Sequence, residues 1–353
     1  MIYPIVILAF ININGESSRI IASVGESYYS QYFDYAFQCQ ILIYIAILIP
    51  LLTIRKKIFT CSPLPIGNGI RLIFLGALFL TYPVAYPAIF GFSNDRFGSG
   101  GSLLLIFNAI LILSRQSKLN IIDYLTIAIN LFALFSGERA DTILILFSYF
   151  LLTSDGTHIK EKNLSNLKLF SALLILFIVG LISGINRVGG EFSLGYLAYY
   201  LLNQGTAVDV IHVYLSSFWY VENIGFNTDP LINFIYSFFP FNSIGGASSE
   251  YNVTSILREH IPSVGGGLFY TAGYVSFGLF GAILCSFFYG LYIKLCFNAG
   301  TILSTLFIAI FIQQLRLQWY GLTYMGNVVS FGIIVFSVIY FFKVFFSKKG
   351  RYE

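Results

Sequence analysis

The sequence contains little charge. Of its 353 residues, 10% are Asp, Glu, Lys or Arg, whereas an ordinary soluble domain has about 25%. Hydrophobic residues make up 57% of the chain, and the mean hydropathy is +0.79. A soluble globule of this length needs a larger polar shell, whereas a bilayer accepts apolar side chains on the outside of a protein. The composition therefore excludes a water-soluble globular protein.

The sequence also lacks the motifs of several chemistries. It has no P-loop, no Rossmann glycine fingerprint, no HExxH motif, no zinc-ligand spacing and no DxD pair. The sequence therefore lacks the residues that usually carry out nucleotide hydrolysis, redox chemistry and nucleotide-sugar chemistry. We expect neither a metal nor a cofactor. The four cysteines have no CxxC spacing and lie within or beside apolar runs, as is typical of small buried hydrophobes: Cys39, Cys61, Cys285 and Cys296.

Long apolar runs are present instead. A membrane helix needs about 20 mostly apolar residues. Ten candidate spans result: 2–13, 36–54, 70–90, 100–113, 121–136, 140–153, 169–185, 268–293, 300–315 and 327–346. The first run has neither the positive start nor the cleavage site of a signal peptide, so we expect it to remain as a span. The prediction is an all-α polytopic membrane protein with ten to twelve helices.

Basic residues predict the orientation, because they gather in short cytoplasmic loops. With both termini in the cytoplasm, fourteen of the twenty Lys and Arg residues lie inside, including every lysine. Twelve of the sixteen acids lie outside. Six external arginines stand out against this acidic background: Arg19, Arg96, Arg139, Arg187, Arg258 and Arg316.

The largest non-spanning stretch is an external loop at residues 186–267, within a single integral domain at 1–353. Residues 193–220 are aromatic and helical in spacing, with polar interruptions at 203–205 and at Asp209. We expect an amphipathic helix pair on the external interface. If this segment crosses the membrane instead, a second crossing near 231–241 is needed to preserve the orientation.

Three external arginines are candidates for anion binding. Arg139 lies in a charged turn with Glu138 and Asp141 between two spans, where charges must pair or face a wet cavity. Arg187 precedes two glycines and Glu191, and Arg316 lies at the outer end of a span. The alternatives are a charge cluster that caps the hairpin at Arg139 and arginines that extend to lipid phosphates at the other two positions.

Another external segment, at 245–267, combines an acid, a guanidinium and an imidazole in Glu250, Arg258 and His260. A histidine or carboxylate can accept a proton from a sugar hydroxyl, and an arginine can hold a phosphate with its planar fork. Alone, His260 is also compatible with an ordinary loop histidine.

Two motifs resemble the Wzy-type O-antigen polymerases, which are oligosaccharide repeat unit polymerases. One is the tight turn with Ser136, Gly137 and Arg139. The other is the late span that starts at Phe269 and has Gly273, Phe277-Gly278 and Gly281, similar to the family's aromatic-x-x-x-G-x-x-x-F-G-x-x-G pattern. The long external loop before that span agrees with the same family.

The resemblance implies a GT-C-like glycosyltransferase in the bacterial inner membrane. Such an enzyme transfers a growing glycan from undecaprenyl pyrophosphate to the next undecaprenyl-pyrophosphate-linked unit at the periplasmic face, without a nucleotide sugar or ATP. Its partners are this lipid-linked oligosaccharide and membrane lipids, with a chain-length regulator as an additional candidate and no nucleic acid. The alternatives are an O-antigen ligase and a lipid-linked oligosaccharide flippase or transporter.

In that reaction, external arginines stabilise the departing pyrophosphate and one external base activates the acceptor hydroxyl. The candidates for pyrophosphate binding are Arg139, Arg187, Arg258 and Arg316. The candidates for the catalytic base are His260, Glu250 and Glu191.

Overall fold

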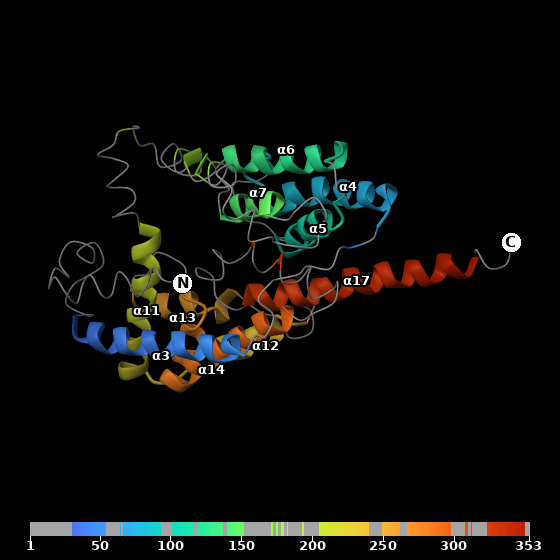
Figure 1. Ribbon diagram of the computed structural model, residues 1–353. Coiled ribbons are helices and arrows are strands. Elements are labelled where there is room, and N and C mark those ends of the chain that lie inside the picture. The colour runs from blue at the N-terminus through green and yellow to red at the C-terminus, as the bar shows by residue number, and fades with distance from the viewer. Residues whose placement is uncertain are drawn as a thin grey trace.

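The computed structural model describes residues 30–53, 64, 66–92, 101–115, 119–136, 140–151, 205–239, 249–261, 267–297 and 323–349, with single positions between 171 and 193 and between 308 and 312. Helices dominate these ranges, and no β-strand is found in them (Figure 1). The predicted all-α class is confirmed for the described part of the chain.

Seven of the described helices overlap predicted apolar spans, and the others lie in the predicted loops. The helical elements are, in chain order, η2 (Ser30–Tyr32), α3 (Phe33–Leu52), α4 (Asn68–Ala85), α5 (Gly101–Leu113), α6 (Ile121–Phe135), α7 (Ala140–Leu151), α11 (Gly205–Asn223), α12 (Asp229–Tyr236), η3 (Ser249–Tyr251), α13 (Val253–Arg258), α14 (Thr271–Phe297) and α17 (Thr323–Lys349).

Three helices are long and apolar enough to cross a membrane: α3, α4 and the part of α14 at Thr271–Leu295. Helices α5 and α6 and the Met325–Tyr340 part of α17 are shorter and apolar. The protein is therefore a helical membrane protein. The predicted spans at 2–13, 169–185 and 300–315 lie outside the described residues, apart from single helical positions in the last two.

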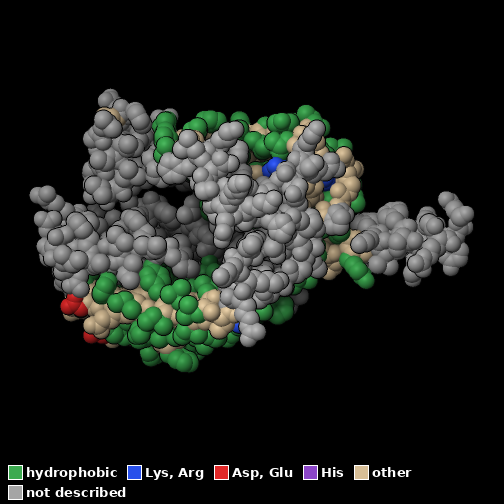
Figure 2. Space-filling model, viewed as in Figure 1, with side chains coloured by type: hydrophobic (Ala, Val, Ile, Leu, Met, Phe, Trp, Pro, Cys, Tyr) green, Lys and Arg blue, Asp and Glu red, His purple; other side chains and the backbone are tan. Residues whose placement is uncertain are grey.

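Helix α3 has one protein-facing side and one apolar outer side. Ala36, Ile43 and Ile47 are buried, whereas Ile45 and Leu48 are about half exposed. This alternation follows the 3.6-residue period of a helix. Figure 2 shows a hydrophobic surface over this part of the molecule, with acidic side chains at the end where α3 begins. An exposed apolar face of this kind is suited to lipid.

Helices α3 and α14 pack closely at a glycine. A Cβ atom on Gly290 of α14 would overlap the carbonyl oxygen of Ile47 in α3. Small residues let helix backbones approach closely, and they are enriched where membrane helices pack. The α3–α14 pair is the centre of one half of the molecule.

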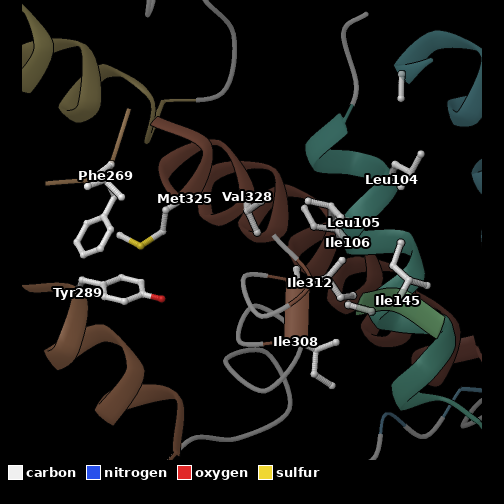
Figure 3. Close-up of a cluster of buried hydrophobic side chains, with 14 of the residues drawn as sticks. Leu104, Leu105, Ile106, Ile145, Phe269, Tyr289, Ile308, Ile312, Met325 and Val328 are labelled. Atoms are coloured by element: carbon white, nitrogen blue, oxygen red, sulfur yellow. The ribbon is translucent and has the colours of Figure 1, made fainter. Parts of the chain in front are cut away.

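The second half consists of α4, α5, α6 and α7, and α17 joins the two halves. Helix α5 is enclosed by protein, with every residue from Asn108 to Leu113 buried. Figure 3 shows α17 between the halves: Met325 lies near Phe269 and Tyr289 on one side, and Val328 lies toward Leu105 of α5 on the other. The apolar side chains of both halves form one core cluster.

Helix α11 lies across the direction of α3 at the start of that helix (Figure 1). It runs without interruption through Asp209, and every residue at 211–218 is buried. This differs from the predicted interface helix, because the aromatic side chains of α11 pack on protein. Helix α12 has eight residues, which at about 1.5 Å per residue is too short for a second crossing.

Candidate functional site

The candidate site lies where α11, α12, η3 and α13 cover the start of α14. Aromatic contacts attach α11 to this end of the molecule. The Phe218 ring is 4.2 Å from the Tyr274 ring and 5.4 Å from the Tyr35 ring, measured between centroids. The Tyr214 hydroxyl donates to the Ala36 carbonyl at 3.4 Å. By the distribution of lysines and arginines, this is the end predicted to be external.

Three predicted site residues flank the short helix α13. Glu250 lies in η3 before it, Arg258 is its last residue, and His260 follows two positions later. All three are exposed. The α13 helix is fixed by Ile256 and Leu257, which are buried in a cluster with Val213, Tyr220 and Val275.

His260 is held from two sides. Its backbone N–H donates to the Leu257 carbonyl at 3.1 Å. Its ring lies 5.5 Å from the Tyr220 ring of α11, between centroids. The imidazole thus has one aromatic neighbour and lies at the surface, where a histidine can act as a base if a hydroxyl comes within hydrogen-bond reach. Arg258 and His260 share one turn, whereas α13 separates both from Glu250.

The other four predicted site residues lie outside the described residues: Glu191, Arg139, Arg187 and Arg316. The turn that contains Arg139 is bounded as predicted, because α6 ends at Phe135 and α7 begins at Ala140. Asp141, in the first turn of α7, is 2% exposed and accepts a 2.9 Å hydrogen bond from the Tyr86 hydroxyl. This carboxylate is therefore held between α4 and α7.

The glycines of the late span produce a break in α14. Phe277 and Gly278 have non-helical backbone angles, and Gly278 has φ of 61° and ψ of −150°, a combination essentially restricted to glycine. After the break, Gly281 lies against Gly273, since a Cβ on either would overlap the carbonyl oxygen of the other. The Val275 carbonyl instead accepts from the Asn227 backbone N–H at 3.0 Å.

A small pocket of about 30 Å³ lies at the start of α14, ahead of this break in the sequence. Its walls come from α12, from the segment that begins α13, from the start of α14 and from Thr323 of α17. The described lining residues include no charged side chain, and those with polar or aromatic side chains are Phe234, Tyr251, Asn252, Thr254 and Thr323. The break-forming glycines belong to the late-span motif, whereas no sequence motif indicated the pocket.

The sequence motifs did not indicate the buried polar side chains that join α4, α5 and α6. Arg71 and Asp123 form an ion pair with an N–O distance of 2.6 Å, and both side chains are fully buried. Further along the same helices, the Tyr82 hydroxyl donates to Asn130 Oδ1 at 2.5 Å, and Asn130 Nδ2 donates to Asn108 Oδ1 at 3.0 Å. The spacing of Asp123, Thr126 and Asn130 puts them on one face of α6, and this spacing is the sequence feature that could have predicted the buried polar side chains.

Tyr32 lies near the site, directly before α3, and its surroundings change its acidity. Burial, followed by a hydrogen bond from its hydroxyl to the Glu222 carboxylate, raises the pKa of Tyr32 to about 12. Glu222 is exposed near the end of α11. The bond therefore ties the end of α11 to the start of α3.

The site combines an exposed imidazole, a guanidinium and a neutral pocket, which suits transfer of a polar, neutral group from an anionic carrier. Among the described residues, no three His, Cys, Asp or Glu side chains are grouped to hold a metal ion. No model of a known protein family, no curated protein and no solved structure matches the chain. The functional conclusion accordingly depends on the chemistry of these residues.

Proposed function

We propose that the protein is a membrane glycosyltransferase that polymerises lipid-linked O-antigen repeat units. It transfers the growing glycan from undecaprenyl pyrophosphate to the next undecaprenyl-pyrophosphate-linked unit. The observation that carries the proposal is the arrangement around α13. A neutral pocket adjoins its first turn at Val253 and Thr254, and exposed Arg258 and His260 lie at its other end.

The chemistry of the transfer assigns a role to each of these groups. The bond between the anomeric carbon of the donor glycan and the pyrophosphate oxygen breaks, and the acceptor hydroxyl oxygen forms the new bond. Arg258 stabilises the negative charge on the departing pyrophosphate, together with the other proposed arginines, Arg139, Arg187 and Arg316. His260 accepts the hydroxyl proton, with Glu250 and Glu191 as the other candidates for this role.

The broken helix supports the same proposal. The family-like glycines Gly273, Gly278 and Gly281 each have a backbone reason to be glycine, and Ala272, which precedes them, lines the pocket. Discontinuous membrane helices are a common way to build a polar site at membrane depth. The proposal includes ten to twelve membrane spans, a GT-C-like fold, a location in the bacterial inner membrane and cytoplasmic termini.

Two alternatives make different demands on the structure. A flippase needs a polar passage through its helices, whereas the buried polar residues Arg71, Asp123, Tyr82, Asn130 and Asn108 bond to one another. An O-antigen ligase uses the same donor and differs in the acceptor. Its distinction from a polymerase therefore requires a measurement of product.

Deletion of the gene tests the proposal. The lipopolysaccharide of a polymerase mutant carries single repeat units, that of a ligase mutant carries none, and a flippase mutant accumulates units on the cytoplasmic face. We expect single units, with long chains restored by the wild-type gene. Long chains in the deletion strain would refute the proposal.

A further inference from the structure

The pocket between α12, α13 and the start of α14 combines an apolar floor with neutral polar groups. Phe234, Leu268 and Ala272 supply apolar surface. Asn252, Thr254 and Thr323 supply a carboxamide and two hydroxyls. Because none of the described residues that line the pocket is charged, it suits neither a phosphate nor a cation.

The polar groups of the pocket are available to a ligand. Asn233 Nδ2 donates to Asn252 Oδ1 at 3.0 Å, which fixes the Asn252 amide and leaves its Nδ2 as a donor. Among the described residues, no hydrogen-bond partner is found for this Nδ2 or for the hydroxyls of Thr254 and Thr323. A fixed carboxamide and two free hydroxyls provide donors and an acceptor for a neutral amide.

The volume limits what enters. At about 30 Å³, the pocket has room for a small substituent and not for a sugar ring. Tyr251 lines the same pocket and is 46% exposed, so its ring offers a flat surface at the opening. Aromatic side chains with one apolar face and one polar end suit such a half-wet position.

We propose that this pocket binds the acetamido group of a 2-acetamido sugar, with the sugar ring on Tyr251. The methyl group contacts Phe234, Leu268 and Ala272. The carbonyl accepts from Asn252 Nδ2, and the amide N–H donates to a threonine hydroxyl. The proposal depends on the function proposed above in one respect: it makes this sugar the acceptor that His260 deprotonates.

Saturation-transfer NMR on the full chain in nanodiscs provides the test, with N-acetylglucosamine and N-acetylgalactosamine as probes and glucose and galactose as controls. We expect the strongest transfer at the acetyl methyl protons and little transfer to the two hexoses. Tyr251→Phe keeps the ring and should keep the signal, whereas Tyr251→Ala should weaken binding roughly three- to tenfold.

Two further variants examine the pocket itself. Asn252→Asp retains the size and the acceptor for Asn233 but removes the donor, so it should abolish methyl transfer. Thr323→Val retains the shape without the hydroxyl and tests the polar rim in a chain that packs normally. Equal transfer from all four sugars, no transfer from any, or wild-type transfer in Asn252→Asp would overturn the inference.

The same measurements separate this inference from the proposed function. If deletion of the gene gives single repeat units but the wild-type protein does not prefer acetamido sugars, the pocket proposal fails and the polymerase proposal stands. If acetamido sugars bind at Tyr251 but long chains persist in the deletion strain, the polymerase proposal fails and the pocket remains a sugar site.

Discussion

Arg71 Nη2 donates a 2.6 Å hydrogen bond to Asp123 Oδ1, and neither side chain is exposed. Arg71 Nε also donates to Ser114 Oγ at 3.2 Å. The two charges lie in the first turns of α4 and α6, which are 52 residues apart in sequence. Each charge therefore depends on the other for its stability inside the protein.

Replacing Asp123 by Asn should destabilise the protein by about 3–5 kcal/mol, because removal of one partner leaves the Arg71 charge buried and uncompensated. The apparent unfolding temperature of the purified protein in detergent, followed by fluorescence-detected gel filtration, measures the effect. The double variant Arg71→Met/Asp123→Leu is the matched control and should recover most of the loss. An unchanged unfolding temperature for Asp123→Asn would show that the pair is not needed.

Substitution at the break in α14 should be costly for backbone reasons. Gly278→Ala places a side chain at φ of 61°, which costs about 1–3 kcal/mol, and its Cβ would lie 3.3 Å from Phe226 Cε1. Gly281→Ala should be worse, since its Cβ would overlap the Gly273 carbonyl.

Gly76→Ala is the control for both variants. A Cβ at Gly76 meets no atom within 4 Å, and alanine favours a helix by about 1 kcal/mol over glycine. This variant should unfold at the same or a higher temperature. If all three variants behave alike, the break is not a rigid feature of the fold.

Tyr32 should make the protein sensitive to alkali. Below pH 10 its hydroxyl is protonated in both the folded and the unfolded states. Between the ordinary pKa of 10.0 and the folded pKa of about 12, the unfolded state loses the proton first, so stability falls as the pH rises through this window.

A difference titration at 295 nm between the wild type and Tyr32→Phe should show one tyrosine that ionises near pH 12. Tyr32→Phe should also lose less stability between pH 10 and 12 than the wild type. Glu222→Gln should move the pKa of Tyr32 toward 10, because it removes the negative charge beside the hydroxyl. A Tyr32 that titrates near pH 10 in the wild type would contradict the burial seen here.

Arg258→Lys should sharply reduce glycan elongation, because lysine keeps the charge but not the bidentate fork. His260→Gln should reduce it by about 10²- to 10⁴-fold if the imidazole is the base. Chain length on lipopolysaccharide gels, at equal amounts of membrane protein, gives the readout. Glu259→Gln, an exposed change between the two, is the control and should leave chain length unchanged. Wild-type chains in Arg258→Lys and His260→Gln would remove both residues from the mechanism.

The sequence predicted the helices well because apolar runs depend on local composition. The runs at 36–54 and 70–90 correspond to α3 and α4, with ends that differ by a few residues. The tight turn before Asp141 also followed from local spacing, since two helices and a loop had to fit into few residues.

Features that depend on distant contacts were not predictable. The break at Gly278 requires the backbone of Gly273 to meet that of Gly281. A glycine within an apolar run does not indicate whether the chain turns there or which residues come into contact. Likewise, nothing local to Arg71 identifies Asp123 as its partner. The pocket at Asn252 depends on α12 and α17 as well as α13, so its lining residues had no common sequence signal.

The break in α14 also limits the length of this helix that can run across a membrane. A straight helix of 27 residues would be about 40 Å long, whereas the hydrocarbon core of a bilayer is about 30 Å thick. Because the chain turns at Phe277 and Gly278, only the length from Leu279 to Phe297, about 28 Å, follows the axis of the span. Gly273, before the break, accordingly lies against Gly281, after it. In the proposed transferase, this turn would keep the start of α14 near the level of a phosphate held at the lipid surface.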